Sequence, residues 1–136
     1  MKYGMTGTRK GMTATQREVF LLALRKQPKL DHLVHGDCLG ADAEAHQIAR
    51  SLGHTVTGRP CTITKQRAFC VVDHQHPARK PIGRNADIVN ESEVMFAFPF
   101  GTKELMRGSG TWATIRYARK KEKLLYIIYP DGSIGK

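Results

Sequence analysis

Short apolar runs alternate along the chain with segments in which apolar residues recur at helical spacing. The runs EVMFAFPF (93–100) and KLLYIIYP (123–130) are largely apolar, as expected for strands buried on both faces of a parallel sheet. One helical face is formed by Ala41, Ala45, Ile48, Ala49 and Leu52. The pattern therefore predicts strands and helices in alternation.

The complete pattern predicts five strands and four helices. Strands are expected over 2–6, 32–35, 54–58, 93–100 and 123–130, and helices over 13–27, 41–52, 82–92 and 111–121. Thr13 and Gln16 form a capping-box signature, and Gly53 suits the position just after a helix. This order predicts an α/β domain over residues 1–136, with a parallel sheet of about five strands and helices on both faces.

Residues 59–81 follow neither period. The stretch contains Pro60, Pro77 and Pro81 together with several basic residues. A loop of this length inside a compact domain is usually a lid or a binding segment. We therefore expect it to take part in function, and a short helix is compatible with its sequence.

Composition limits the class of partner and the compartment. The 136 residues carry 22 basic and 12 acidic side chains, a net charge of +10, which favours a phosphorylated small molecule or a nucleic acid. No run of eighteen apolar residues predicts a membrane span, and the first residues do not resemble a secretory signal. Three cysteines without framework spacing indicate a reducing, cytoplasmic location.

The strongest candidate site is the small-residue run that opens the last predicted helix. It consists of Gly108, Ser109, Gly110 and Thr111. Glycines allow backbone N–H groups to approach an anion, and the start of a helix favours negative charge. An ordinary helix cap explains the same residues. We expect a phosphate group to bind here.

Two further turns follow predicted strands. The first contains Gly7, Thr8 and Arg9, and the second contains Gly36, Asp37, Gly40 and Asp42. Ligands of open parallel sheets bind beyond the carboxyl ends of the strands. We expect Arg9 to contact phosphate and Asp37 to accept hydrogen bonds from ribose hydroxyls. Simpler explanations exist for two of these residues: Arg9 can be an ordinary surface charge, and Asp42 can stabilise the start of the helix through its dipole.

A metal site is not predicted. Histidine and cysteine residues do occur near one another in sequence, at His35, Cys38, Cys61, Cys70, His74 and His76. Their spacing matches no closed zinc site, and no C-x-x-C pair is present. We expect neither a metal nor a cofactor.

Four segments in order resemble the SLOG superfamily. They are TGTR (6–9), HGDCLGADAEAHQIA (35–49), GRNADIV (83–89) and GSGTWATIRYA (108–118). The superfamily includes the LOG-type cytokinin-activating phosphoribohydrolases and the DNA-processing protein DprA. The chain is most similar to its small, single-domain YspA-like and YpsA-related branch. The resemblance implies a Rossmann-like sheet that binds nucleotides or nucleotide-derived molecules.

The resemblance adds Arg84 and Asn85 to the candidate site. In related domains this pair points at the ligand from a helix beside it. An arginine can bind phosphate in bidentate fashion, and an asparagine can recognise a base or ribose edge. An arginine that ties the helix to a loop is the simpler alternative.

One departure from the family concerns catalysis. LOG-type enzymes carry a PGGxGTxxE motif whose glutamate serves catalysis, whereas this chain has MRGSGTWAT, with Thr114 at the glutamate position. Cleavage of an N-riboside passes through an oxocarbenium-like state that a carboxylate stabilises. We therefore expect ligand binding to be retained and enzymatic activity to be absent.

Three functions remain open at this point. The first is a sensor or sequestering protein for an ADP-ribose-like or cyclic-nucleotide signalling molecule, by analogy in phage counter-defence. The second is a nucleoside monophosphate N-glycosidase in which Asp37, Asp42 or Glu104 replaces the glutamate. The third is nucleic-acid binding in the manner of DprA. Because LOG-like relatives pair through helices, a homo-oligomer is expected.

Overall fold

The computed structural model describes all residues, 1–136, as an α/β protein with a seven-stranded sheet. The strands are β1 (Lys2–Gly7), β2 (His32–His35), β3 (Thr55–Gly58), β4 (His74–Gln75), β5 (Val94–Phe98), β6 (Leu124–Ile128) and β7 (Ile134–Gly135). The helices are α1 (Ala14–Lys26), α2 (Ala41–Ser51), α3 (Pro81–Glu91), α4 (Gly110–Lys120) and the 3₁₀ helix η1 (Thr64–Gln66).

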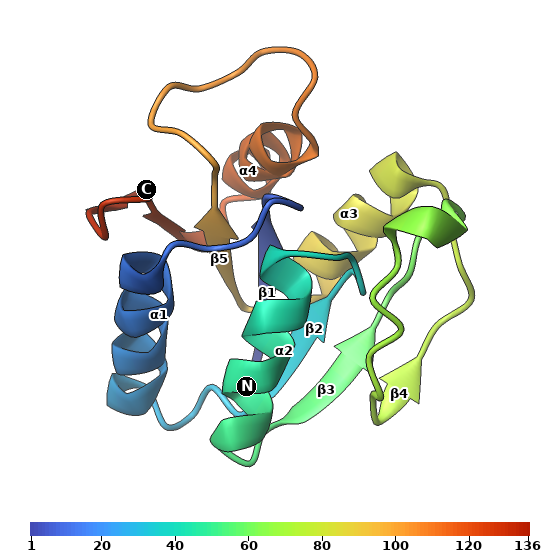
Figure 1. Ribbon diagram of the computed structural model, residues 1–136, viewed down its shortest axis with the longest axis horizontal. Coiled ribbons are helices and arrows are strands. Elements are labelled where there is room, and N and C mark those ends of the chain that lie inside the picture. The colour runs from blue at the N-terminus through green and yellow to red at the C-terminus, as the bar shows by residue number, and fades with distance from the viewer.

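The central strand of the sheet is β1. The order is β4-β3-β2-β1-β5-β6-β7, and all pairs are parallel except β6 with β7. The chain builds outward from β1 in one direction through β2 and β3, and in the other through β5 and β6 (Figure 1). The point between β1 and β5 is therefore the topological switch, where ligands of such sheets bind.

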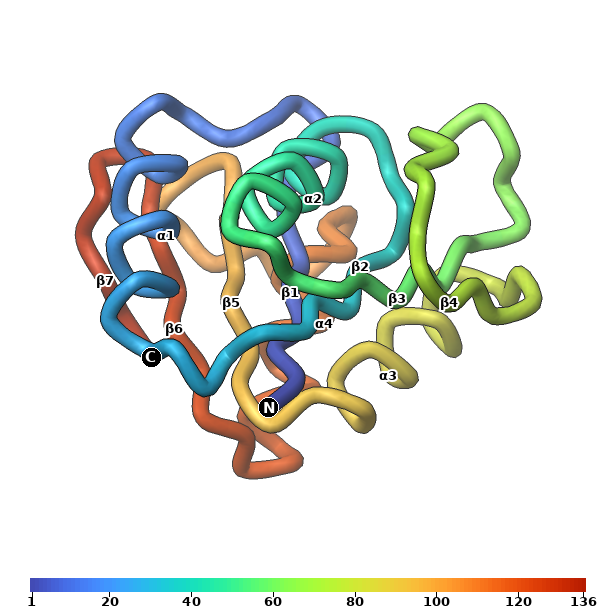
Figure 2. Tube along the Cα trace, turned by 90° about the horizontal axis from the view of Figure 1, so that it is seen from below, coloured from blue at the N-terminus to red at the C-terminus, as the bar shows by residue number.

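Helices cover both faces of the sheet (Figure 2). On one face, Phe20 of α1 and Ala45 of α2 belong to a core that includes Tyr3 and Phe96. On the other face, Ile88 of α3 and Ile115 of α4 pack with Met95. Alternate residues of β5 thus serve opposite cores, which explains why its sequence is continuously apolar. None of the helices is both long enough and apolar enough to cross a membrane.

The predicted fold class is confirmed, and so are the five main strands and four helices. Thr13 and Gln16 form both hydrogen bonds of the capping box, and Gly53 adopts a left-handed conformation after α2. The sequence did not reveal β4 and β7, because each has only two residues and depends on a neighbouring strand for its pairing.

The segment 59–81 is folded against the sheet edge. It contains η1 and β4, and His74 of β4 pairs with Thr57 of β3. Near its start, Cys61 forms an isolated bridge with Arg79, close to its end. The short helix expected in this segment is present as η1.

Gln16 connects α1 to the carboxyl ends of two strands. Its side-chain Nε2 donates to the carbonyl oxygens of Pro99 (3.2 Å) and Ile128 (2.9 Å), and its Oε1 accepts from the N–H of Thr13. The residue is buried. It therefore fixes the point at which the chain leaves β5 to form the loop before α4.

We expect Gln16→Ala to lower the free energy of unfolding by about 1–3 kcal/mol, because buried carbonyls would lose their donor. Urea denaturation followed by circular dichroism measures the change. Glu18→Ala, at an exposed position of the same helix, is the control and should have little effect. Equal stabilities of the two variants would contradict the assignment.

Candidate functional site

A cavity of about 940 Å³ lies at the carboxyl ends of β1 and β5. Its walls come from the β1–α1 turn, the β5–α4 loop with the first turn of α4, and the first residues of α3. Ile63 and Gln66 of segment 59–81 form part of the wall, and Cys38 and Asp42 also line the cavity. It occupies the switch point that the sheet order defines, and its size suits a small-molecule ligand.

The first turn of α4 presents free backbone donors to this cavity. Ser109 caps the helix, and its Oγ accepts from the N–H of Trp112 at 3.2 Å. The N–H groups of Gly110 and Thr111 donate to no protein acceptor. Both residues line the cavity. Free amides at a helix start, in a cavity, form a ready anion site.

Asn85 adds a side-chain donor beside these amides. Its Oδ1 accepts from Nε of Arg84 at 2.7 Å, and its Nδ2 donates to no protein acceptor. The same Nδ2 lies 3.8 Å from the place that a Cβ of Gly110 would occupy. Asn85 and Gly110 are therefore neighbours across the cavity wall, as expected for two members of one site.

Basic side chains surround the opening. Arg9, Lys10 and Lys103 line the cavity, and none of them belongs to an ion pair of the protein. The Lys10 ammonium lies 4.5 Å from the centre of the Phe100 ring. Phe100 lines the cavity while 65% exposed. The opening thus combines positive charge with an accessible aromatic face.

Lys10, Phe100 and Lys103 were not among the residues predicted for the site. Lys10 follows TGTR directly, and Phe100 and Lys103 lie at and just beyond the end of a predicted strand. The carboxyl-end rule therefore points to all three.

The β2–α2 turn differs from the start of α4, because the N–H groups of Gly36, Cys38, Leu39 and Ala41 already have protein acceptors. Asp42 Oδ2 accepts from the N–H groups of Gly36 (3.0 Å) and Cys38 (3.1 Å). The N–H of Leu39 donates to Gln66, and that of Ala41 donates to Thr8. The turn therefore holds an internal carboxylate where the sequence suggested an external anion.

Glycines of the first two turns permit close packing. A Cβ on Gly36 would overlap the guanidinium of Arg84, and a Cβ on Gly40 would overlap the backbone of Arg9. At Gly7 it would meet the Cβ of Ala41. Gly36 and Gly40 lie outside the cavity lining, whereas Gly7, Thr8, Arg9 and the Gly108–Thr111 run belong to it.

Asp37 also lies outside the lining, which differs from its expected place beside a ribose. Its Oδ2 accepts from Nε of Arg67 at 3.0 Å and forms an ion pair with Nη2 of the same residue at 3.0 Å, and its Oδ1 accepts from the N–H of Cys70 at 2.8 Å. The residue is buried and has a left-handed backbone, with φ 55°. Asp37 thus anchors segment 59–81, a long-range role that the local sequence does not show.

Arg84 lines the cavity but is committed to the protein. Its Nη1 donates to the carbonyl oxygen of Gly36 at 2.6 Å, and its Nη2 contacts Cys38 Sγ at 3.5 Å. The simpler of its two predicted roles, tying α3 to a loop, describes these contacts. Its charge still contributes positive potential at the cavity floor.

Asp42 is the one carboxylate-bearing residue that lines the cavity. Burial raises its pKa to about 6, although the charge of Arg84 and the N–H groups of Cys38 and Gly36 act in the opposite direction. The other candidate carboxylates are engaged elsewhere, since Glu104 pairs with Arg116 and Arg119. Thr114 cannot replace the missing glutamate, because its hydroxyl donates to the carbonyl of Gly110.

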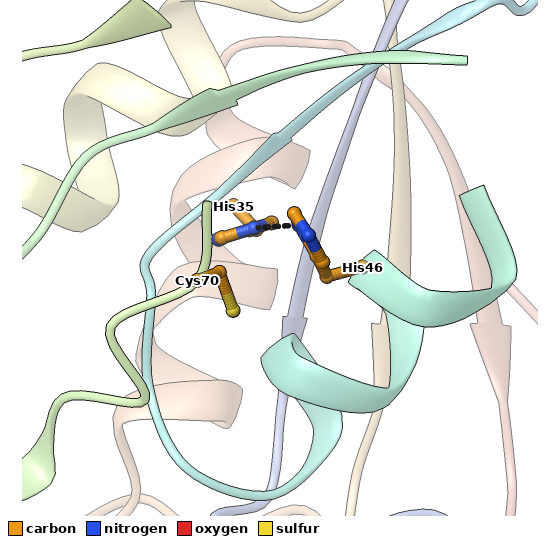
Figure 3. A group of neighbouring side chains, drawn as sticks. All are labelled: His35, His46 and Cys70. Atoms are coloured by element: carbon orange, nitrogen blue, oxygen red, sulfur yellow. Dashed lines mark hydrogen bonds between the residues drawn. The ribbon is translucent and has the colours of Figure 1, made fainter. Parts of the chain in front are cut away.

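A second cluster consists of His35, His46 and Cys70 (Figure 3). Their potential ligand atoms lie within 4.8 Å of one another. Sequence reasoning missed His46, which meets His35 only through the packing of α2 on β2. The arrangement has the composition of a transition-metal site.

The hydrogen bonds of this cluster favour a structural role. The N–H of Asp37 donates to Nδ1 of His35 at 2.9 Å, so a neutral His35 carries its proton on Nε2, which lies 3.1 Å from Nδ1 of His46. A metal at Nε2 requires the opposite tautomer. Burial and the nearby Asp37 charge raise the pKa of Cys70 to about 12, which disfavours a thiolate ligand.

No protein-family model matches the sequence, and no curated protein matches it. Solved structures do resemble the fold. The molybdenum cofactor binding protein of Rippkaea orientalis aligns with a TM-score of 0.71 and 21% identity over 94% of this chain and 76% of its own. The likeness shows that the two chains share a fold.

Two further solved structures share this fold. DNA processing protein A of Helicobacter pylori, described with a single-stranded DNA binding mode, aligns with a TM-score of 0.63 and 19% identity over 93% of this chain and 64% of its own. The molybdenum cofactor carrier protein of Chlamydomonas reinhardtii aligns with a TM-score of 0.61 and 25% identity over 96% of this chain and 75% of its own. One fold thus serves small-molecule and nucleic-acid partners.

The buried histidine pair makes stability depend on pH. Burial, with the charge of His46 acting in the same direction, lowers the pKa of His35 to about 3. Because the unfolded residue has a pKa of about 6.5, unfolding takes up a proton as the pH falls below that value. The contribution of His35 is present above about pH 6.5 and is lost progressively toward about pH 3.

We expect His35→Asn to lower stability at neutral pH, because the contact with His46 is lost, and to flatten the decline between about pH 6.5 and 5 by up to about 1.4 kcal/mol per pH unit. Urea denaturation across that range measures both. Asp42, whose pKa is raised in the folded state, makes stability increase as the pH falls, and it does so in both the wild-type protein and the His35→Asn variant. Parallel curves for the two proteins would contradict the role of His35.

Proposed function

We propose that this protein binds a phosphorylated, nucleotide-derived small molecule in the cavity at the carboxyl ends of β1 and β5, as a sensor or sequestering protein. The observation that carries the proposal is the pair of N–H groups of Gly110 and Thr111, which have no protein acceptor and belong to residues that line the cavity. A helix start of this kind favours a phosphate group through its donors and its dipole.

The surroundings of these amides support an anionic ligand with a flat ring. Arg9, Lys10 and Lys103 supply unpaired positive charge, and Asn85 supplies an additional donor. The exposed face of Phe100 offers a stacking surface at the opening. An ADP-ribose-like or cyclic-nucleotide signalling molecule has both features. Sequestration of such a molecule is the activity that a phage counter-defence protein requires, and we include this role in the proposal by analogy.

The molybdenum cofactor belongs among the ligands to be tested. Two of the similar solved structures are molybdenum cofactor binding or carrier proteins, and they align over 94% and 96% of this chain. Their likeness supports the cofactor as a candidate for the same cavity. Co-purified ligand identified by mass spectrometry distinguishes it from a nucleotide.

A substitution at the first residue of α4 tests the anion site directly. Gly110→Pro removes one N–H, and the fixed φ of proline suits this position of a helix. The preceding residue, Ser109, already has an extended conformation, with φ −133° and ψ 112°, as a residue before proline requires. The variant should therefore fold.

We expect Gly110→Pro to weaken the binding of ADP-ribose and AMP by about tenfold or more, because a hydrogen bond to a charged group is lost. Gly110→Ala is the matched control, since it retains the N–H and its Cβ has space. Isothermal titration calorimetry measures both. Equal loss in the two variants would indicate steric blockage, and unchanged affinity in Gly110→Pro would contradict the phosphate position.

Hydrolysis of a nucleoside monophosphate is the alternative that one observation favours. Among Asp37, Asp42 and Glu104, only Asp42 lines the cavity, so an N-glycosidase would depend on it. Its pKa of about 6 leaves it largely ionised at neutral pH. The LOG-type glutamate position nevertheless carries Thr114, whose hydroxyl is bound to the helix backbone.

We therefore expect that AMP, GMP, CMP and UMP remain intact on prolonged incubation with the protein at high concentration, because no carboxylate occupies the LOG-type position. Chromatography for free base measures this. Base release that disappears in Asp42→Asn would establish the enzymatic alternative and reject a purely binding role.

A further inference from the structure

The two oxygens of the Asp42 carboxylate have different environments. Oδ2 accepts hydrogen bonds from the N–H groups of Gly36 and Cys38, whereas Oδ1 accepts no hydrogen bond from the protein. Only 6% of the residue is exposed. No fully buried side-chain oxygen of the protein lacks a hydrogen-bond partner, so Oδ1, which has none, is not fully buried. Since Asp42 lines the cavity, Oδ1 is the atom that it presents there.

This oxygen differs in charge from the other polar groups of the lining. Asp42 is the one carboxylate among the lining residues, which include three unpaired cations and the free amides of α4. Asn85 presents its Nδ2 after Arg84 occupies its Oδ1. The cavity therefore offers free amides at the start of α4 and its one carboxylate at the start of α2, where the Arg84 guanidinium also packs.

Such polarity fixes the orientation of a phosphorylated ligand. A phosphate against Asp42 would bring two negative charges together, so the phosphate binds at α4 and a group that carries a proton binds at Asp42. A cationic amine at that position would be repelled by Arg84, whose guanidinium contacts the same turn. A neutral hydroxyl satisfies Oδ1 without this cost.

We propose that Asp42 is a specificity residue that accepts a hydrogen bond from a ribose hydroxyl of the bound sugar phosphate, so that the site selects ribonucleotides over their deoxy analogues. The inference rests on the proposed function and deepens it, because it assigns the sugar as well as the phosphate. The sequence analysis predicted that Asp37 would bind the ribose, and the inference assigns this role to Asp42 instead.

The test compares ligands of equal charge. Isothermal titration calorimetry is performed with AMP, 2′-deoxy-AMP, 3′-deoxy-AMP, inosine monophosphate and inorganic phosphate on the wild-type protein and on Asp42→Asn. The asparagine keeps an oxygen for the N–H groups of Gly36 and Cys38 and presents an amide nitrogen to the cavity. Circular dichroism and thermal melting verify that the variant is folded.

We expect the wild-type protein to bind at least one deoxy analogue about tenfold more weakly than AMP. Inosine monophosphate should bind with the same affinity as AMP. In Asp42→Asn the ratio of AMP to deoxy-AMP affinity should fall to within about twofold. A structural defect or a change in net charge affects AMP and deoxy-AMP alike, so the ratio reports on the hydroxyl alone.

The remaining outcomes separate the two proposals. Equal binding of AMP and both deoxy analogues by the wild-type protein overturns the inference and leaves the proposed function intact. A loss confined to inosine monophosphate assigns Oδ1 to the base amine and also overturns the inference. Binding of phosphate alone, or failure of all five ligands, overturns the inference, and titration with ADP-ribose then decides the proposed function.

If Asp42→Asn does not fold, the wild-type protein decides the matter through pH. Protonation of Asp42 replaces a charged acceptor by a neutral one, so the AMP to deoxy-AMP ratio should fall between about pH 8 and 5. The ligand phosphate titrates in the same range but equally in both ligands. A constant ratio would overturn the inference.

Discussion

The buried Asp42 carboxylate organises the β2–α2 turn on which much of the site depends. Its Oδ2 draws the N–H groups of Gly36 and Cys38 onto one atom, while Arg84 from α3 binds the carbonyl of Gly36. The turn is thereby closed from both sides by opposite charges. A buried carboxylate needs such compensation, because desolvation alone would cost several kcal/mol.

The same interaction explains why two similar helix starts have different roles. Ahead of α2, the Asp42 side chain and the carbonyls of Gln66 and Thr8 accept the N–H groups of Gly36, Cys38, Leu39 and Ala41, so the protein itself fills this turn. At α4 the capping Ser109 uses one amide and leaves those of Gly110 and Thr111 free. Small residues before a helix therefore indicate a potential anion site, but only the surrounding structure determines whether the protein already fills it.

The sequence predicted most of the fold because the signals are local. Helical periodicity, the Thr13–Gln16 capping box and the apolar runs of β5 and β6 each depend on neighbouring residues. The site was predicted less completely. Asp37 is engaged by Arg67, thirty positions away, and His35 by His46 on the facing helix. Such partners cannot be identified from a single sequence, since no local pattern encodes them.

The arrangement also assigns a physical purpose to the long segment 59–81. Arg67 and Cys70 attach it to Asp37, and the carbonyl of Gln66 accepts from Leu39. These contacts hold Ile63 and Gln66 in the cavity wall. A wall fixed by buried hydrogen bonds keeps the cavity formed without a ligand, so less conformational entropy is lost on binding. The free amides of α4 then face a preorganised space, which is the condition under which an anion binds them in preference to water.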